Sequence, residues 1–184
     1  MSYWVELVNT EDEMTRDLPW LMPIIKEEGL PFSAAITYGI SPWHTDEYYA
    51  RLTKDLVQKF KPVRIWLKDV MGLLTPERAR TWIPAIMNNA EGIPVELHSH
   101  GMSGNHERNF VEAMKLGVRI FHTCVPPLAW GSSHPSIFNT IHNAHILGLE
   151  TNINEEPPSN IQPSDTRGHD LKYSGATKAV RYRG

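Results

Sequence analysis

The sequence predicts an α/β fold in which parallel strands alternate with helices. Short segments with the apolar alternation of a strand recur along the chain, and each is followed by a longer segment with the apolar spacing of a helix. This order indicates βαβ units with right-handed crossovers and a site at the carboxyl ends of the strands. Because 184 residues are fewer than the roughly 250 of a complete barrel, we expect a partial (β/α)8 TIM barrel of about five to six βα units.

Turn and capping residues bound the expected elements. The expected strands are residues 3–9, 32–38, 63–68, 95–100, 118–125 and 149–153. The expected helices are residues 17–29, 45–60, 75–89, 103–116 and 135–147. Thr45 and Thr75 are typical helix N-caps. Gly29 and Gly117 are typical of the residues that end a helix.

We expect the chain to have two parts. Residues 1–153 form the partial TIM-barrel domain, whereas residues 154–184 are rich in Pro, Ser, Asn, Gly and charge and show no sustained period. Such a composition buries too little apolar surface to offset chain entropy, so we expect a flexible, disordered tail. An incomplete curved sheet has two open edges, so an oligomer or a complementing barrel segment is expected, unless the sequence is a fragment.

Composition excludes several classes of partner. The net charge of -3 and the pI near 6.3 give no reason to expect nucleic acid or an anionic membrane surface. Cys124 is the only cysteine, which excludes an internal disulfide and suits a reducing cytosol. The first residues lack the basic flank and apolar run of a signal peptide, and no segment approaches the roughly 18 apolar residues of a membrane span. We therefore expect a soluble, cytoplasmic protein.

The candidate chemistry lies in two consecutive βα units. His98 and His100 are two apart on an expected strand and so point to the same side, and Lys68 ends the preceding strand on the matching face. Imidazole is a common ligand of zinc and similar divalent ions. A lysine becomes a ligand only after losing its proton, as the amine or as the carbamate formed with CO2. On the two histidines alone, hydrogen-bonded imidazoles on an ordinary strand are the simpler interpretation.

Motifs around these residues resemble a known family. LKDVMGLLTP, which contains Lys68, and HSHGMSG, which begins at His98, resemble the carboxyltransferase barrel of pyruvate carboxylase, oxaloacetate decarboxylase alpha chain and transcarboxylase. AITYGISPWHT and GSSHPS resemble further motifs of that family, and the resemblance covers residues 17–150. It implies that Lys68 is the family's carbamylated metal ligand and that His98 and His100 are its two metal-binding histidines.

Four further residues are candidates for the site. Asp69 is expected to belong to the catalytic group by orienting Lys68 or a metal ligand, and the alternative is a loop carboxylate that bonds the backbone amides of its own loop. Tyr38, Ser41 and His44 lie in AITYGISPWHT, where they could contact a substrate or merely fix the turn before the next helix.

The sequence also departs from the family. Gly101 and Met102 stand where the family has Asp-Thr, His122 where it has an aspartate, and His134 where it has a glutamine. The family's first-strand Asp-x-x-x-Arg-Asp segment, which gives the fourth metal ligand, has no match here. His122 could replace an aspartate at the metal, but a satisfied core histidine is the favoured interpretation.

The resemblance implies a biotin-dependent carboxyltransferase. In that family a divalent metal (Zn, Mn or Co is expected) polarises the keto oxygen of a 2-oxo acid such as pyruvate or oxaloacetate. Biotin is delivered on a carrier, so the implied partners are a biotin carboxyl carrier and a biotin carboxylase. Two alternatives stay open. One is a metal-dependent lyase or aldolase resembling the hydroxymethylglutaryl-CoA lyase and isopropylmalate synthase barrels, and the other is a truncated, non-catalytic barrel fragment.

Overall fold

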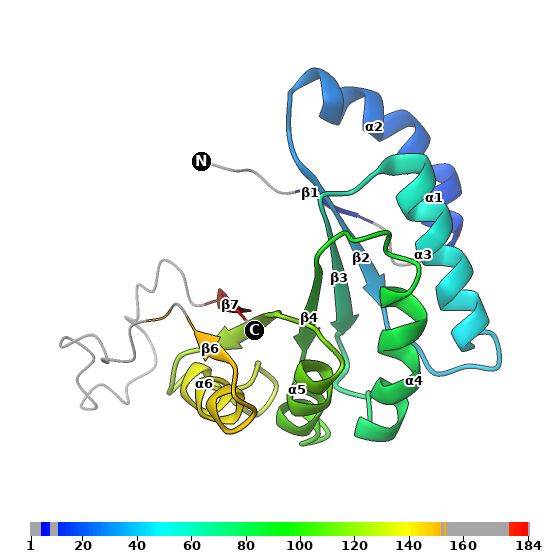
Figure 1. The fold of residues 1–184 in the computed structure, drawn as a ribbon. Helices are drawn as coiled ribbons and strands as arrows, with labels where there is room; N and C mark the ends of the chain where they lie inside the picture. Colours follow the sequence, from blue (N-terminus) through cyan, green and yellow to red (C-terminus); the bar gives the residue numbers. More distant parts are fainter. Residues whose placement is uncertain (1–4, 8–10, 152, 154–176, 184) are drawn as a thin grey trace.

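The computed structural model describes residues 5–7, 11–151, 153 and 177–183. Its main part is a curved sheet of parallel strands with helices along the convex side (Figure 1). The parallel strands are β1 (Val5–Leu7), β2 (Phe32–Thr37), β3 (Arg64–Asp69), β4 (Val95–Ser99) and β5 (Ile120–Cys124). The helices are α1 (Glu11–Arg16), α2 (Leu18–Glu27), α3 (Asp46–Phe60), α4 (Pro76–Met87), α5 (His106–Lys115) and α6 (Ile137–Ile146).

The order of the parallel strands in space follows their order in the chain, from β1 to β5. Each strand therefore returns beside its predecessor after a helix on the same side, which is the winding of a (β/α)8 barrel rather than of a doubly wound sheet. The predicted α/β class and its partial-barrel character are confirmed.

Alternation along β3 separates the core from the inner face of the sheet. Ile65 and Leu67 are fully buried towards the helices, whereas Arg64, Trp66 and Lys68 lie half-buried on the other face. The layer between sheet and helices is closed by large apolar side chains, including Trp82, Tyr49, Phe110 and Phe121. The inner face of the sheet carries Trp66 together with polar and ionisable groups such as Arg64 and Lys68.

The predicted helix starts are confirmed at two places. The Thr45 hydroxyl accepts a hydrogen bond from the Tyr48 amide at 3.2 Å, and the Thr75 hydroxyl accepts one from the Arg78 amide at 3.2 Å. These bonds satisfy amides that the first turn of a helix leaves without an intrahelical partner.

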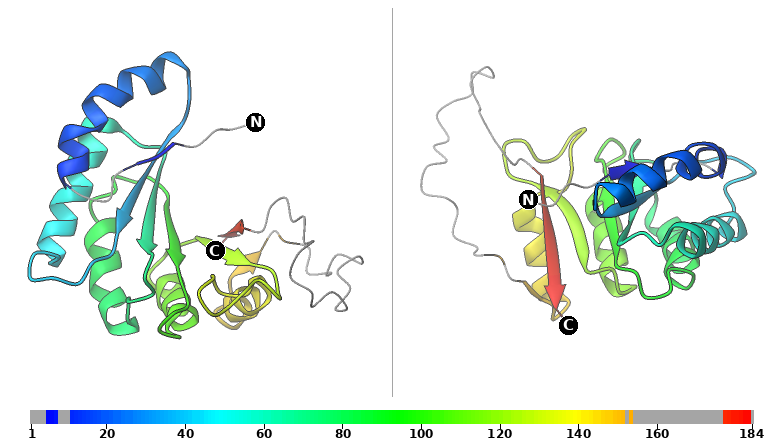
Figure 2. Two further views of the ribbon diagram at one scale, coloured as in Figure 1. Left: turned by 180° about the vertical axis from the view of Figure 1, so that it is seen from behind. Right: turned by 90° about the horizontal axis from the view of Figure 1, so that it is seen from above.

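The end of the chain contains a strand that was not predicted. Thr177–Arg183 form β7, which pairs antiparallel with β5 and with the two-residue strand β6 (Glu150–Thr151), as Figure 2 shows. The free edge of β5 supplies a row of amides and carbonyls for this pairing, which overrides the local composition. Residues 154–176 lie outside the described residues. No helix in the described part of the chain is long and apolar enough to cross a membrane.

Candidate metal and active site

Four histidines meet at the carboxyl ends of the central strands. His98 lies in β4 and His100 directly follows it, His122 lies in β5, and His134 lies in the loop between β5 and α6. The His98 ring centroid is 4.2 Å from that of His134, 5.0 Å from that of His100 and 5.2 Å from that of His122. This is the end of the sheet at which barrel sites are built.

Three of these imidazoles form a donor set that fits a metal ion. One ring nitrogen from each of His98, His100 and His134 lies within 4.8 Å of the other two. The Nε2 atoms of His98 and His100 are 3.2 Å apart. In a tetrahedral zinc site with Zn–N bonds of about 2.0–2.1 Å, two ligand nitrogens are roughly 3.3 Å apart. The residues present therefore fit a zinc-like divalent ion.

The surroundings of His98 favour a neutral ring. The pKa of His98 is lowered to about 2, first by burial and then by the neighbouring His134, His122, His100 and Lys68 in that order. Neutral imidazole is the form that binds metals. The site therefore holds His98 ready as a ligand without the need to remove a proton near neutral pH.

Lys68 lies where the strand pattern predicted it. It pairs directly with His98 in the register of β3 and β4, so the two side chains share the inner face. The charge on Lys68 contributes to the lowered pKa of His98, which indicates that the two groups are close.

His122 is held by other partners. The Glu96 carboxylate accepts a hydrogen bond from His122 Nε2 at 2.9 Å and an ion-paired one from Arg64 Nη1 at 2.6 Å. The other ring nitrogen of His122, Nδ1, lies 3.0 Å from His98 Nδ1. Both nitrogens of His122 thus have protein partners, which agrees with the favoured interpretation of a satisfied core histidine.

Asp69 points to the helix side of the sheet, opposite to Lys68. Its carboxylate accepts hydrogen bonds from the Leu73 amide at 2.7 Å and the Ser99 hydroxyl at 2.8 Å. Burial raises the pKa of Asp69, and these hydrogen bonds oppose that rise. The Asp69 carbonyl also accepts from the His100 amide at 3.0 Å. These are the contacts of a loop carboxylate, and they join the ends of β3 and β4. The expected role of Asp69 in orienting Lys68 or a metal ligand stays a prediction.

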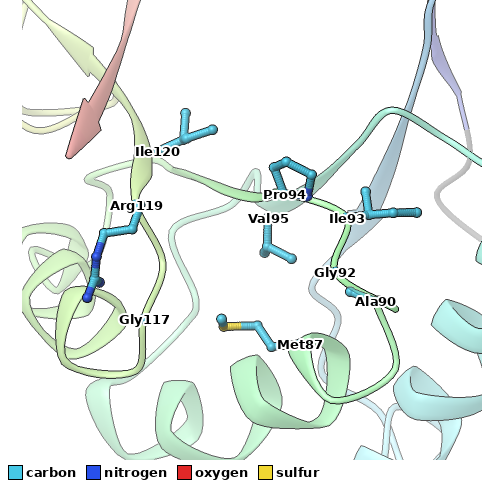
Figure 3. A pocket seen from close by; sticks show the side chains of 9 residues that line it. All are labelled: Met87, Ala90, Gly92, Ile93, Pro94, Val95, Gly117, Arg119 and Ile120. Carbon is cyan, nitrogen blue, oxygen red and sulfur yellow. The ribbon is translucent and has the colours of Figure 1, made fainter. Parts of the chain in front are cut away.

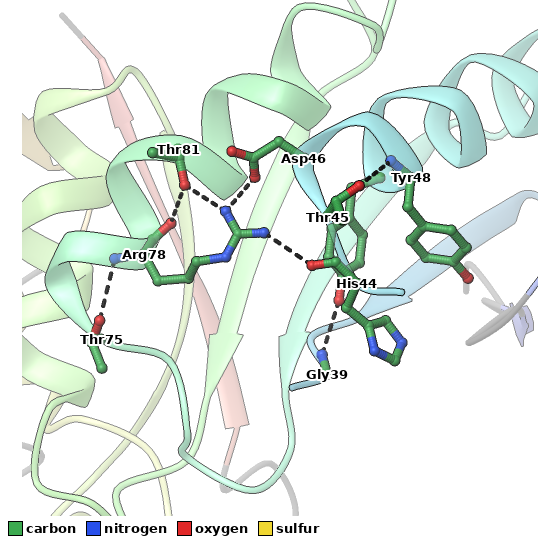
Figure 4. Close-up of polar contacts among 9 residues, drawn as sticks. Gly39, His44, Thr45, Asp46, Tyr48, Thr75, Arg78 and Thr81 are labelled. Carbon is green, nitrogen blue, oxygen red and sulfur yellow. Dashed lines mark hydrogen bonds and ion pairs between the residues drawn. The ribbon is translucent and has the colours of Figure 1, made fainter. Parts of the chain in front are cut away.

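The candidate substrate residues are engaged in their own turn. The Ser41 hydroxyl lies 2.7 Å from His44 Nδ1, and the Tyr38 ring packs on Trp82 with centroids 5.1 Å apart. Arg78 of α4 donates to the His44 carbonyl at 3.3 Å and pairs with Asp46, as Figure 4 shows. These contacts fix the turn and dock it on α3 and α4. Their role towards a substrate stays a prediction.

His134 is the residue that sequence reasoning missed as a donor. The motif comparison marks it only as a replacement for a glutamine, and the path of its loop is not predictable. The Cys124 amide donates to the Pro135 carbonyl at 3.0 Å, which brings this loop back to the end of β5. The signal that could have indicated His134 is its place in the loop after a strand, because the sites of such barrels are built from these loops.

A hollow of about 290 Å³ lies elsewhere, at the amino ends of β4 and β5 (Figure 3). Apolar side chains such as Met87, Ile93 and Ile120 line it, together with Arg119. The Arg119 guanidinium donates to the Met114 and Val118 carbonyls at 2.8 and 3.0 Å. Because its lining offers no imidazole, carboxylate or thiol, this hollow is not the candidate site.

Comparison with known proteins supports the resemblance seen in the motifs, although no family model matches the chain. The chain is 27% identical over 147 residues to a pyruvate carboxylase subunit of Methanothermobacter thermautotrophicus, covering 80% of this chain and 26% of that protein. It is 34% identical over 141 residues to the 2-oxoglutarate carboxylase large subunit of Hydrogenobacter thermophilus, covering 75% and 21%. The chain thus spans about a quarter or less of these curated relatives.

Solved structures give the same result. The carboxyl transferase domain of Rhizobium etli pyruvate carboxylase matches with a TM-score of 0.67 and 26% identity, covering 78% of this chain and 24% of that one. The hydroxymethylglutaryl-CoA lyase of Brucella melitensis matches with a TM-score of 0.62 at 18% identity, over 80% of this chain and 58% of that one, which shows a shared fold. The recognition of a carboxyltransferase-type barrel is confirmed: this chain is similar in sequence and fold to those domains.

Proposed function

We propose that this chain supplies the metal-binding part of a biotin-dependent carboxyltransferase site. The reaction is the transfer of CO2 between carboxybiotin and a 2-oxo acid such as pyruvate or oxaloacetate. The observation that carries the proposal is the direct pairing of Lys68 with His98, beside His100. It supports the role that the motifs imply for these three residues, because one face of two adjoining strands presents all three side chains.

A divalent ion bound here would act as a Lewis acid on the keto oxygen of the acid. In the proposed transfer, the C–N bond of carboxybiotin breaks and a C–C bond to the acid's methyl carbon forms. The proton lost by that carbon ends on the biotin nitrogen. The half-buried His98 and the neighbouring His100 would hold the ion, and Lys68 would complete the set as the carbamate.

The proposed partners follow from this chemistry. Carboxybiotin must arrive on a carrier after a biotin carboxylase has loaded it, as the relatives named carboxylases suggest. A second copy or a complementing barrel segment would close the sheet at the β1 edge. We propose the cytoplasm as the compartment, which the single free Cys124 suits.

The decisive experiment is decarboxylation of oxaloacetate by the purified chain with zinc, manganese or cobalt, with and without free biotin. We expect pyruvate release that requires both metal and biotin. Lys68→Ala should lower this activity at least about tenfold. Loss of a residue that only supports a metal ligand already lowers metal affinity or activity by about 10–100-fold. Lys54→Ala is the matched control, because Lys54 lies exposed on α3.

The outcomes separate the alternatives. Absence of biotin-dependent decarboxylation by the metal-loaded wild-type chain, alone and with an added N-terminal barrel segment, would contradict the proposal. Metal-dependent cleavage of a hydroxymethylglutaryl thioester would favour the lyase alternative instead. Metal binding without either activity would favour the non-catalytic fragment.

A further inference from the structure

Two histidines of the cluster have tautomers that their hydrogen bonds define. His100 Nδ1 lies 2.7 Å from the Ser132 carbonyl oxygen, and His134 Nδ1 lies 3.0 Å from the Ser99 carbonyl oxygen. A carbonyl oxygen can only accept, so each Nδ1 carries the proton. In the neutral rings, the Nε2 atoms of His100 and His134 therefore present lone pairs.

A third tautomer is set by a longer chain of contacts. The Glu96 carboxylate, only 1% exposed and paired with Arg64, accepts the proton of His122 Nε2. The tautomer of His122 that donates from Nε2 carries a lone pair on Nδ1, which lies 3.0 Å from His98 Nδ1 and can accept a hydrogen bond from it. His98 is thereby left with its lone pair on Nε2, 3.2 Å from Nε2 of His100. A carboxylate that orients a ligand through a hydrogen bond is a common arrangement behind metal sites.

We infer that His134 is a metal ligand, and that the ion is held by the Nε2 atoms of His98, His100 and His134 together. Nε2 lone pairs that face one another repel unless a proton or a cation lies between them. Three imidazoles around a divalent ion leave one position open in a tetrahedral site. The inference rests on the proposed function only in placing a divalent cation at this end of the sheet.

The loop holds His134 in place before any ion binds. His134 is 6% exposed, and its carbonyl accepts from the Trp130 amide at 3.0 Å. The Ser133 amide in turn donates to the Trp130 carbonyl at 2.9 Å. Because these two hydrogen bonds fix the loop backbone at His134, little chain entropy is lost on binding an ion, which favours a ligand role over a chance contact.

The test is titration of the metal-free full chain with Zn²⁺ alone, followed by calorimetry, for the wild type and for His134→Ala. We expect His134→Ala to lower the affinity for Zn²⁺ at least about tenfold. Removal of a residue that only hydrogen-bonds to a ligand already costs about 10–100-fold. His142→Ala is the matched control, because His142 lies exposed on α6. Equal affinities of wild type and His134→Ala would overturn the inference.

A second measurement keeps the inference testable if His134→Ala does not fold. Long-range ¹H–¹⁵N spectra of the wild-type rings should show the Nε2 signals of His98, His100 and His134 shifting on addition of Zn²⁺, while each Nδ1 stays protonated. An unchanged Nε2 signal of His134 would overturn it. Zn²⁺ binding that needs His134, in a chain without biotin-dependent decarboxylation, would support this inference and contradict the proposed function, so the two fail separately.

Discussion

At the level of single residues, Gly72 controls how closely the ends of β3 and β4 approach. Its φ is 61°, in the left-handed region, and a Cβ built there would lie 2.6 Å from the His100 carbonyl oxygen and 2.9 Å from the Met102 amide nitrogen. Those neighbours are backbone atoms, so they cannot rotate away. Only glycine at position 72 therefore lets the backbone at His100 lie this close to the loop that follows β3.

We predict that Gly72→Ala destabilises the fold more than Gly148→Ala. Gly148 also has a positive φ, of 74°, but nothing lies within 4 Å of the place that a Cβ would take there. The left-handed backbone alone costs about 1–2 kcal/mol, and steric overlap adds about 1–3 kcal/mol at Gly72. Urea unfolding measures both variants. Equal losses in the free energy of unfolding would show that the loop moves aside freely.

The positions of the candidate site residues differ in how far the sequence could predict them. Lys68, His98 and His100 were predictable, because the period of two in a strand and the order of βα units place them on one face. The same period puts Asp69 on the opposite face from Lys68, as its contacts with Leu73 and Ser99 bear out. His134 was not predictable, since its place depends on hydrogen bonds within a loop rather than on any periodic pattern.

At the level of elements, ion pairs join neighbouring helices on the convex side. Glu112 of α5 accepts from Arg80 Nε of α4 at 2.9 Å and from Lys115 Nζ at 3.1 Å. The hydrogen bond with Arg80, followed by that with Lys115, lowers the pKa of Glu112 to about 2. A carboxyl group whose pKa is lower in the folded state stabilises the fold above its unfolded pKa and loses that effect as the pH falls through the folded value.

We predict that Glu112→Gln lowers the free energy of unfolding near neutral pH by no more than about 1 kcal/mol, because Arg80 and Lys115 are about half exposed and solvent screens the pairs. The difference from wild type should shrink from about pH 4.5 down to about pH 2, and also in about 1 M salt. Glu27→Gln on the exposed side of α2 is the control. A difference that persists near pH 2 would point to packing rather than charge.

The elements themselves were largely predictable from caps and periods, with the short helix α1 and the strand β7 as exceptions. Thr45 and Thr75 start their helices as expected, and β3 alternates as its apolar pattern indicates. β7 was not predictable, because its seven residues gain their order from pairing with β5 and β6, which are remote in sequence. Local composition carries no information on such a partner.

At the level of the whole molecule, the candidate site exists only in the folded chain. His98 and His100 come from the end of β4, and His134 comes from a loop that begins after β5. Their ring nitrogens come within 4.8 Å of one another only once β4 and β5 pair and the loop returns. An ion that binds all three should therefore stabilise the native state over the unfolded chain.

We predict that Zn²⁺ at about a hundred times its dissociation constant raises the stability by about 2.7 kcal/mol. For a chain of this size each kcal/mol corresponds to roughly 2–4 °C, so the melting temperature should rise by about 5–10 °C. Ca²⁺, which prefers oxygen ligands, should give no comparable rise. The shift should be lost in His98→Ala and kept in His142→Ala, measured by thermal unfolding with each ion. A full rise in melting temperature in His98→Ala would mean that Zn²⁺ binds elsewhere. The stabilisation would then not come from the three imidazoles.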